Sequence, residues 1–425
     1  DTIRNEDQTM AERKYHPDYR QADVSAIVRA LDQGLSVSVI GPPSIGKSNL
    51  LQFLDQARLS GTEDSTNPWI RYATNTMFKG NLIMISVDPN ALLPSLPRER
   101  GDVAAAAWPG FELLTHRTTI TAELYPLMNQ VQVDQGDDSN IATQIANLQT
   151  RFESAHPSMT DFRDHLHAHL ALRHLESIID ASLKAAEVQQ NPIRIIYFMD
   201  EFERFLVTMP NYFFVALRSL RDRFKERVMF VTFTRNSLPY IIGEGERMLI
   251  LEPFIELFYD STVYLKPFND DDAWRMIDQL EEARTVSKDD HGLGLLIRAS
   301  GGFAGLLRGG FKHADKLSQI QHQDYGQAIG LAAKQLVAEK NIQEECKTLL
   351  RGLRSDEINT IFGIASQRTN LDQRTIDELL NKSLLSQATA GGVIRVSPPV
   401  LAAYIRNNPT PPESIPMPRP ATMPE

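Results

Sequence analysis

One short stretch of the sequence has the residue types and spacing that bind phosphate. Residues 41–48 read GPPSIGKS and match G-x-x-x-x-G-K-[ST] in full. Glycines let such a loop curl so that backbone N–H groups face phosphate oxygens, and the helix that follows adds partial positive charge. We therefore expect this loop to bind ATP or ADP, with Lys47 on the β- and γ-phosphates and Ser48 on Mg²⁺. The nucleotide-binding residues predicted here are Gly41, Pro42, Pro43, Ser44, Ile45, Gly46, Lys47, Ser48 and Asn49.

A second stretch supplies two adjacent carboxylates. Residues 193–201 read IRIIYFMDE, an apolar run that ends in Asp200 and Glu201. Such a strand end is the Walker B pattern, in which one carboxylate holds Mg²⁺ and the other polarises the attacking water. We assign the metal to Asp200 and the water to Glu201. The catalytic set predicted from the sequence is Lys47, Asp200, Glu201 and Arg235.

Two further sites are candidates for nucleotide sensing. The run 228–234 ends in Thr234 and is followed by Arg235, which could contact the γ-phosphate, and by Asn236, which is the competing candidate. The stretch 300–308, SGGFAGLLR, has a Gly-Gly turn that opens a helix, and Arg308 on that helix could face the phosphates. An ordinary surface arginine is the alternative at both positions, and the sequence leaves it open.

These residues need strands and helices to position them. Apolar runs predict strands, and apolar residues at helical spacing predict helices between them. Strands that alternate with helices indicate an α/β fold, here a P-loop NTPase with a parallel sheet covered on both faces. The predicted strands are 35–40, 82–87, 193–199, 228–234 and 262–265. The predicted helices include 22–33, 159–189, 212–224, 270–283, 290–299, 303–317 and 325–351.

The same pattern predicts a domain order. After about residue 269 the strands stop and helices follow, and 354–405 combine helices with a Gly-turned hairpin. The expected order is a lead-in (1–21), a P-loop ATPase core (22–268) with an insertion at about 89–157, a helical lid (269–335), a winged-helix domain (336–406) and a disordered Pro-rich tail (407–425). Ser355 is the expected N-cap of the first winged-helix helix.

Composition excludes several classes of protein. The 425 residues carry 44 basic and 54 acidic side chains and a net charge of -10, which argues against wrapping of DNA by the whole chain. The predicted winged helix has nine Lys or Arg against eight Asp or Glu, a poor balance for phosphate binding. A single cysteine, Cys346, excludes internal disulfides, and no apolar run is long enough to span a membrane. We expect a cytoplasmic protein.

Taken together, the motifs resemble the STAND branch of the AAA+-like P-loop ATPases, in particular the bacterial novel-STAND type. The phrases DEFERF, FFVALRSLRDRF and GGFAGLLR carry the resemblance, which covers about residues 15–405. It implies a slow, regulatory ATPase that is closed with ADP and open and oligomerising with ATP, with Arg235 as the sensor. It also implies a partner protein that carries a sensor or effector. The chain departs from the pattern at Ala304, where many members have Pro, and lacks a counterpart of their winged-helix histidine.

The predicted function is thus an ATP-dependent switch, in bacterial signalling or defence, that controls oligomerisation or a protein partner. The alternative is a DNA-associated AAA+ ATPase, such as a transposition regulator or an origin-recognition type protein. A third hypothesis is a subunit that binds nucleotide and scarcely hydrolyses it. Two weaker signals remain. Histidines 165, 167 and 169 lie in a predicted helix, where we favour a solvated helix face over a zinc site. Arginines 218, 221 and 223 lie in another predicted helix, where we favour a basic surface over an arginine finger.

Overall fold

The computed structural model describes most of the chain outside several segments. The described residues are 19–59, 81–92, 107–121, 124, 162–280, 291–321, 325–367, 371–387 and 392–411. Most of the predicted lead-in, most of the predicted insertion and most of the predicted tail therefore lie outside the described residues.

A five-stranded sheet forms the centre of the fold. Its strands are β1 (Val37–Ile40), β2 (Asn81–Val87), β3 (Ile193–Met199), β4 (Val228–Thr234) and β5 (Thr262–Tyr264), in the order β2-β3-β4-β1-β5. β3 pairs in parallel with both β2 and β4. Every residue of β1, β3 and β4 is buried, as expected for continuous apolar runs in a sheet covered on both faces. The predicted parallel α/β fold is confirmed.

By its internal contacts the chain divides into two compact units. One unit contains residues 1–24, 40–56 and 263–417, and the other contains 25–39, 57–262 and 418–425. The phosphate-loop sequence therefore belongs to the same unit as the C-terminal helices. Asp200 and Glu201 belong to the other unit, and the two are described separately.

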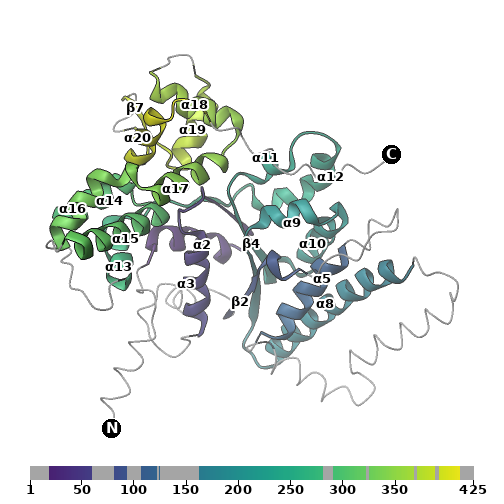
Figure 1. The fold of residues 1–425 in the computed structure, drawn as a ribbon. Coiled ribbons are helices and arrows are strands. Elements are labelled where there is room, and N and C mark those ends of the chain that lie inside the picture. Colours follow the sequence, from purple (N-terminus) through teal and green to yellow (C-terminus); the bar gives the residue numbers. More distant parts are fainter. Residues whose placement is uncertain are drawn as a thin grey trace, which may run out of the picture. The chain divides into compact units, whose positions relative to one another are not determined.

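The unit with β2, β3 and β4 has an aromatic core. Helices α5 (Trp108–Thr119) and α8 (Phe162–Val188) lie side by side, with α5 against β2 and α8 against β3 (Figure 1). Helices α9 (Phe202–Thr208), α10 (Asn211–Phe224), α11 (Leu238–Ile242) and α12 (Glu246–Ile255) complete this unit. Phenylalanines from α9, α10 and α12 pack against one another, with ring centres 5.3 to 6.1 Å apart. They include Phe202, Phe205, Phe213, Phe214 and Phe254.

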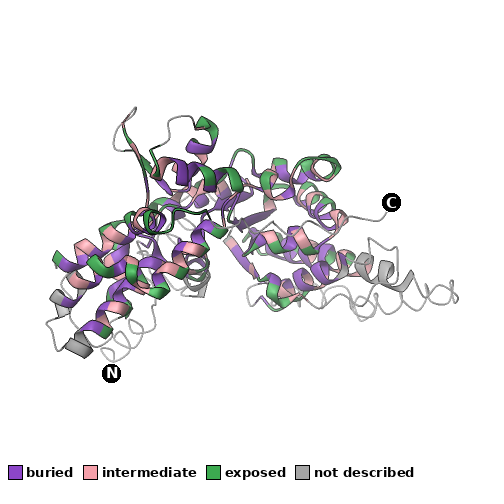
Figure 2. Cartoon of the chain, turned by 45° about the horizontal axis from the view of Figure 1, so that its top comes forward, coloured by how far each residue is buried: buried purple, intermediate pink, exposed green. Residues whose placement is uncertain are grey.

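The other unit is helical apart from strand ends and a hairpin. After α3 (Lys47–Leu59) it contains α13 (Asp270–Leu280), α14 (His291–Ser300), α15 (Ala304–Gln321), α16 (Tyr325–Gln335) and α17 (Lys340–Arg351). Its last part is α18 (Ser355–Ala365), α19 (Gln373–Asn381), the antiparallel strands β6 (Leu385–Gln387) and β7 (Ile394–Val396), and α20 (Pro399–Asn407). In Figure 2 most of these helices show buried residues along one face and exposed residues along the other.

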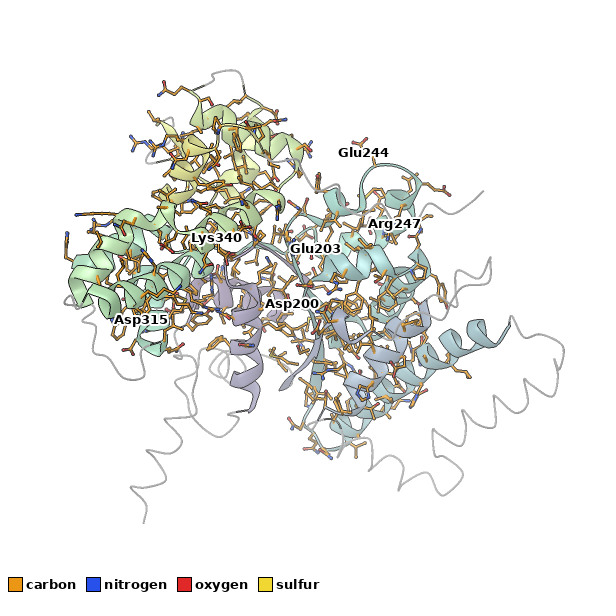
Figure 3. All side chains as sticks on the ribbon, in the orientation of Figure 1. Asp200, Glu203, Glu244, Arg247, Asp315 and Lys340 are labelled. Carbon is orange, nitrogen blue, oxygen red and sulfur yellow. The ribbon has the colours of Figure 1, made fainter. Side chains whose placement is uncertain are left out.

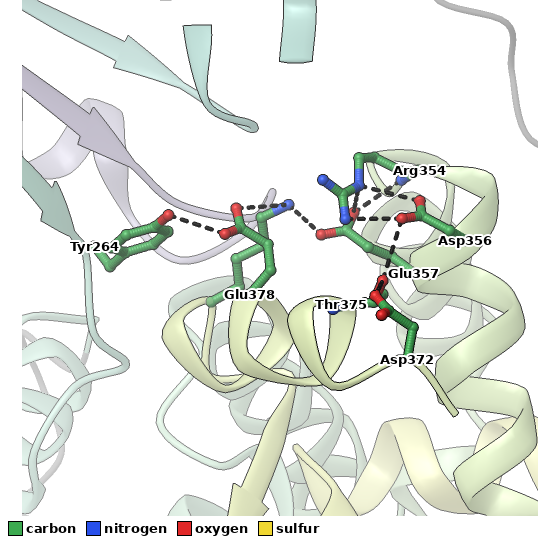
Figure 4. Close-up of polar contacts among 8 residues, drawn as sticks. Tyr264, Arg354, Asp356, Glu357, Asp372, Thr375 and Glu378 are labelled. Carbon is green, nitrogen blue, oxygen red and sulfur yellow. Dashed lines mark hydrogen bonds and ion pairs between the residues drawn. The ribbon is translucent and has the colours of Figure 1, made fainter. Parts of the chain in front are cut away.

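A polar network joins α18 to α19 (Figure 4). The Lys382 ammonium lies 2.6 Å from a Glu357 carboxylate oxygen, and neither side chain is exposed. Lys382 also lies 3.8 Å from Glu378, whose carboxylate accepts a hydrogen bond of 3.0 Å from the Tyr264 hydroxyl. The network thereby connects the end of β5 to the two helices.

Two local predictions are wrong. The segment 325–351 is not one helix, because α16 ends at Gln335 and a 3-10 turn and an extended Glu339 precede α17. Ser355 is the first residue of α18 rather than its cap. The cap is Arg354, whose backbone N–H donates to the Glu357 carboxylate at 2.9 Å, because a Glu three residues into a helix can reach back to the cap.

Among the residues that the structure describes, none forms a helix that is long and apolar enough to cross a membrane.

Candidate nucleotide-binding site

The predicted phosphate loop connects the end of β1 to the start of α3. Two of its residues have a left-handed backbone, Ser44 with φ 62° and Gly46 with φ 101°. Left-handed residues in such a loop turn successive backbone N–H groups toward a bound anion. Helix α3 begins directly after the loop, so its N-terminus adds partial positive charge there. Lys47 Nζ donates to the carbonyl oxygens of Gly41 at 2.6 Å and Pro42 at 3.1 Å, so the lysine lies over its own loop.

The rest of the predicted nucleotide set lies on the same loop and the first turn of α3. Gly41, Pro42, Pro43 and Ile45 are buried, whereas Ser48 is exposed. Ser48 is in the first turn of α3, directly after Lys47, and its predicted contact with Mg²⁺ stays a prediction. Asn49 is half-buried beside it.

Arg20 supports this loop from a distant part of the sequence. Its guanidinium donates to the Ile45 carbonyl in the loop and, at 2.6 Å, to the Lys266 carbonyl. It also forms an ion pair of 2.9 Å with Asp23, and it lies 4.5 Å from the ring centre of Phe268. The arginine side chain is only 1% exposed. Sequence reasoning placed Arg20 in a loose lead-in, and the Arg-x-x-Asp spacing just before α2 (Gln21–Asp32) was the one signal available.

Burial affects the carboxylates around Arg20. It raises the pKa of Asp23 above its ordinary value, and Arg20 and Lys266 oppose that rise. Burial likewise raises the pKa of Asp272, which accepts a hydrogen bond of 3.2 Å from the Arg20 backbone N–H. The cluster therefore holds Arg20 between two carboxylates and the loop.

Helices α15 and α17 contact the loop directly. The Gly305 N–H donates to the Ser44 carbonyl at 3.0 Å, and the Ser44 hydroxyl donates to the Glu345 carboxylate. A Cβ added at Gly352, directly after α17, would lie 2.9 Å from the Pro43 ring. Neither Gly305 nor Glu345 was predicted, because their partners lie hundreds of residues away in sequence.

The two carboxylates lie where β3 turns into α9. Asp200, which is labelled in Figure 3, is half-buried. Its carboxylate accepts the Glu201 N–H at 2.9 Å. Glu201 is exposed and has φ 42°, a left-handed conformation that is strained for a residue other than glycine. Its carboxylate lies 3.4 Å from Arg204. The strained turn directs two carboxylates out of the end of one strand.

The neighbouring strand β4 ends beside the same turn. The Arg235 backbone N–H donates to the Glu203 carboxylate, which links the end of β4 to α9. The Arg235 side chain is exposed, whereas Asn236 is buried at 4% exposure. The choice of Arg235 over Asn236 as the sensor stays a prediction. The half-buried Glu203 thus positions the end of β4.

The Gly-Gly turn at 301–302 is packed against other segments of its unit. Gly301 and Gly302 have φ of 59° and 75°, and the Gly302 carbonyl accepts the Phe268 N–H at 2.9 Å. A Cβ at Gly301 would lie 2.7 Å from the Pro398 ring. Arg308 is exposed on α15. Its predicted contact with phosphate stays a prediction.

The available donors suit magnesium. Mg²⁺ is usually held by one or two carboxylates together with substrate phosphates and water, rather than by a cage of protein ligands. Asp200 carries a carboxylate at the end of β3 and Ser48 a hydroxyl at the start of α3, and their joint binding of Mg²⁺ stays a prediction. Among the described residues there is no cluster of three or more His, Cys, Asp or Glu that could hold a metal without phosphates.

The weaker sequence signals have different outcomes. The side chains of the histidines at 165, 167 and 169 lie outside the described residues. Each of the three α10 arginines has a partner within its unit. Arg218 pairs with Asp222 at 3.0 Å, Arg221 donates to the Gly34 carbonyl at 2.6 Å, and Arg223 lies 2.8 Å from Glu176.

Comparison with known proteins finds similarity only among solved structures. No protein-family model matches the sequence, and no curated protein matches it. The Walker-type ATPase PABY2304 of Pyrococcus abyssi aligns over 91% of this chain and 95% of its own, with 14% identity and a TM-score of 0.44. The ORC2 protein of Aeropyrum pernix, in ADPNP and ADP complexes, aligns over 92% and 93% with 12% identity and a TM-score of 0.44.

A third similar structure is the ORC1 protein of Aeropyrum pernix in complex with DNA. It aligns over 92% of this chain and 93% of its own, with 12% identity and a TM-score of 0.36. These similarities concern the course of the whole chain, and the assignment of site residues rests on the loop and carboxylates themselves. The resemblance to the STAND branch stays a prediction.

Proposed function

We propose that this chain is a Mg²⁺-dependent ATPase of the P-loop type. The observation that carries the proposal is the curled loop 41–46 between a buried strand and a helix, with Lys47 lying over it. Backbone N–H groups of such a loop bind phosphate oxygens, and a lysine at this position neutralises the charge on the β- and γ-phosphates.

Each residue of the proposed site has a distinct task. Lys47 binds the phosphates, and Ser48 and Asp200 supply oxygen ligands for Mg²⁺ when it is bound. Magnesium neutralises charge on the phosphates and so favours phosphoryl transfer. Glu201 orients the attacking water and accepts its proton, and Arg235 contacts the γ-phosphate.

We further propose that the nucleotide state controls the C-terminal helices and, through them, a protein partner or self-association. The hydrogen bonds from Gly305 and Ser44 support this, because they connect the phosphate loop to α15 and α17 within one compact unit. A loop that rearranges around phosphates would change those contacts.

The test uses nucleotide binding, hydrolysis and particle size. Lys47→Ala should abolish both the thermal stabilisation by MgATP and the release of phosphate, whereas Lys312→Ala, an exposed lysine on α15, should change neither. Glu201→Gln should bind MgATP as the wild type does, hydrolyse it at least about 100-fold more slowly, and retain any ATP-dependent oligomer. Equal stabilisation of Lys47→Ala and the wild type by MgATP would refute the proposal.

DNA is the second candidate partner. Helices α18 and α19, the β6–β7 hairpin and α20 follow in the order expected of a winged helix, and Arg395 on β7 is exposed. The ORC1 structure similar to this chain contains DNA. Fluorescence anisotropy with duplex DNA at low salt, with and without ATP, tests this candidate. Binding that Arg395→Ala weakens would support it, and absence of binding in every nucleotide state would exclude it.

A further inference from the structure

A carboxylate from α17 occupies a position on the phosphate loop that neither ATP binding nor hydrolysis requires. The Ser44 hydroxyl donates to Glu345, and both side chains are half-buried. A Cβ added at Gly305 would lie 3.1 Å from the same Glu345 oxygen and 2.7 Å from the Ser44 Cβ. The small residue on α15 therefore leaves room for the serine and the glutamate to meet.

Ser44 has a backbone conformation that is strained for a residue with a side chain. With φ 62° it holds a left-handed backbone that glycine would adopt without strain. Its side chain forms the hydrogen bond to Glu345, which a glycine could not make, and its carbonyl accepts the Gly305 N–H. The serine thus joins the loop to α15 and α17 at the same point.

The negative charge of Glu345 affects which nucleotide the loop can bind. The loop has the geometry that binds anions, and Glu345 brings a negative charge to it. A carboxylate beside bound phosphates repels them, and ATP carries one more negative charge than ADP. The repulsion therefore acts more strongly on ATP than on ADP.

We infer that Glu345 is a specificity-determining residue that makes the phosphate loop favour ADP while α17 stays on Ser44, so that full ATP binding requires the carboxylate to leave the loop. The inference rests on the proposed function and adds to it the residue through which the C-terminal helices respond to the number of phosphates. Binding of ATP then weakens the Ser44–Glu345 contact, and the contact weakens the binding of ATP by the same factor. The position of α17 therefore depends on which nucleotide is bound.

The experiment compares affinities for MgATP and MgADP by isothermal titration calorimetry. Glu345→Gln keeps the shape and the hydrogen-bond acceptor of the side chain and removes its charge. Glu344→Gln is the matched control, since it removes the same charge one residue away on an exposed side chain that pairs with Lys347. Ser44→Ala removes the hydroxyl that holds the carboxylate.

The expected result is a change in the ratio of the two dissociation constants. Glu345→Gln should shift the ratio of Kd for ATP to Kd for ADP toward ATP by about 3- to 50-fold, the range given by Coulomb's law for one charge at about 7 Å between protein-surface and water dielectric constants. The shift should shrink as salt rises. Glu344→Gln should change the ratio by less than about twofold. Ser44→Ala should shift it in the same direction as Glu345→Gln, and the double variant should not be additive.

The outcomes separate this inference from the proposed function. A wild type that binds neither nucleotide overturns both. Normal binding with an unchanged ratio in Glu345→Gln, or equal shifts in Glu345→Gln and Glu344→Gln, overturns the inference alone. If Glu345→Gln without nucleotide has a melting temperature far below that of the wild type, the test passes to Ser44→Ala. An unchanged ratio of Kd for ATP to Kd for ADP in Ser44→Ala then also overturns the inference.

Discussion

The buried pair of Lys382 and Glu357 allows a quantitative test of how the α18–α19 region is held together. Both side chains have 0% exposure and lie 2.6 Å apart, and Glu378 lies 3.8 Å from the same ammonium. Replacing Lys382 by Met keeps the length of the side chain and removes the nearest cation from the buried Glu357 carboxylate, whose other cationic partner, Arg354, lies 3.7 Å away. Loss of one partner of a buried pair costs about 3–5 kcal/mol.

The same unit contains a matched surface pair. Lys347 and Glu344 on α17 lie 2.7 Å apart, but their side chains are 37% and 52% exposed. Water already screens this pair, so Lys347→Met should cost less than about 1 kcal/mol. The two substitutions are chemically identical and the two separations differ by 0.1 Å, so the difference between the two variants measures the effect of burial.

The assay is unfolding by heat and by urea, followed by circular dichroism. At roughly 2–4 °C per kcal/mol for a unit of this size, Lys382→Met should lower the midpoint by roughly 6–20 °C. Lys347→Met should lower it by at most roughly 4 °C. Equal shifts in the two variants would refute the reasoning, since burial would then make no difference to the energy of the pair.

Three further predictions concern single residues. Gly302→Ala should lower the free energy of unfolding by at least about 2 kcal/mol, because the added Cβ would overlap the backbone of Phe268 at a left-handed φ, whereas Gly294→Ala within α14 should be neutral or stabilising by up to about 1 kcal/mol in urea unfolding. Burial, and then the nearby Glu345 charge, raises the pKa of the Cys346 thiol to about 12. Maleimide labelling of the folded protein should therefore be slow at pH 7 and rise as pH approaches that value, and labelling in urea as fast as in buffer would contradict it. Glu203→Ala should lower kcat by about 3- to 30-fold with little change in nucleotide affinity in steady-state kinetics, because it frees the backbone N–H of Arg235 at the end of β4 and leaves the sequence of the phosphate loop unchanged.

The sequence predicts best the features that local residues determine. The observed bounds of β3 and β4 are the same as those of the predicted strands. Each strand is a continuous apolar run that polar residues follow directly, so its end is visible in the sequence. The phosphate loop is equally local, since the glycines, Lys47 and Ser48 lie within eight residues. Such patterns are visible without knowledge of the tertiary fold.

The missed features depend on contacts between distant residues. Arg20 meets the Lys266 carbonyl across 246 positions, and Ser44 meets Glu345 across 301. Neither arginine nor glutamate differs in sequence from an ordinary surface residue. The break between α16 and α17 could not be predicted either. Leu336 is apolar and buried and continues the helical pattern of the sequence, although the backbone there forms a 3-10 turn. Exact helix caps, partners and breaks therefore required the structure.

The division of the chain into units has a consequence for how the protein is made. Residues 40–56, which include the phosphate loop, leave the ribosome before most of their unit, which lies mainly at 263–417. More than two hundred residues of the other unit are translated between the phosphate loop and the residues that support it. Those residues are Lys266, which holds Arg20, and Gly305 and Glu345, which contact Ser44. A nascent chain that ends at residue 262 thus carries the complete phosphate-binding motif without the contacts that shape it, and nucleotide binding should be acquired only late in synthesis.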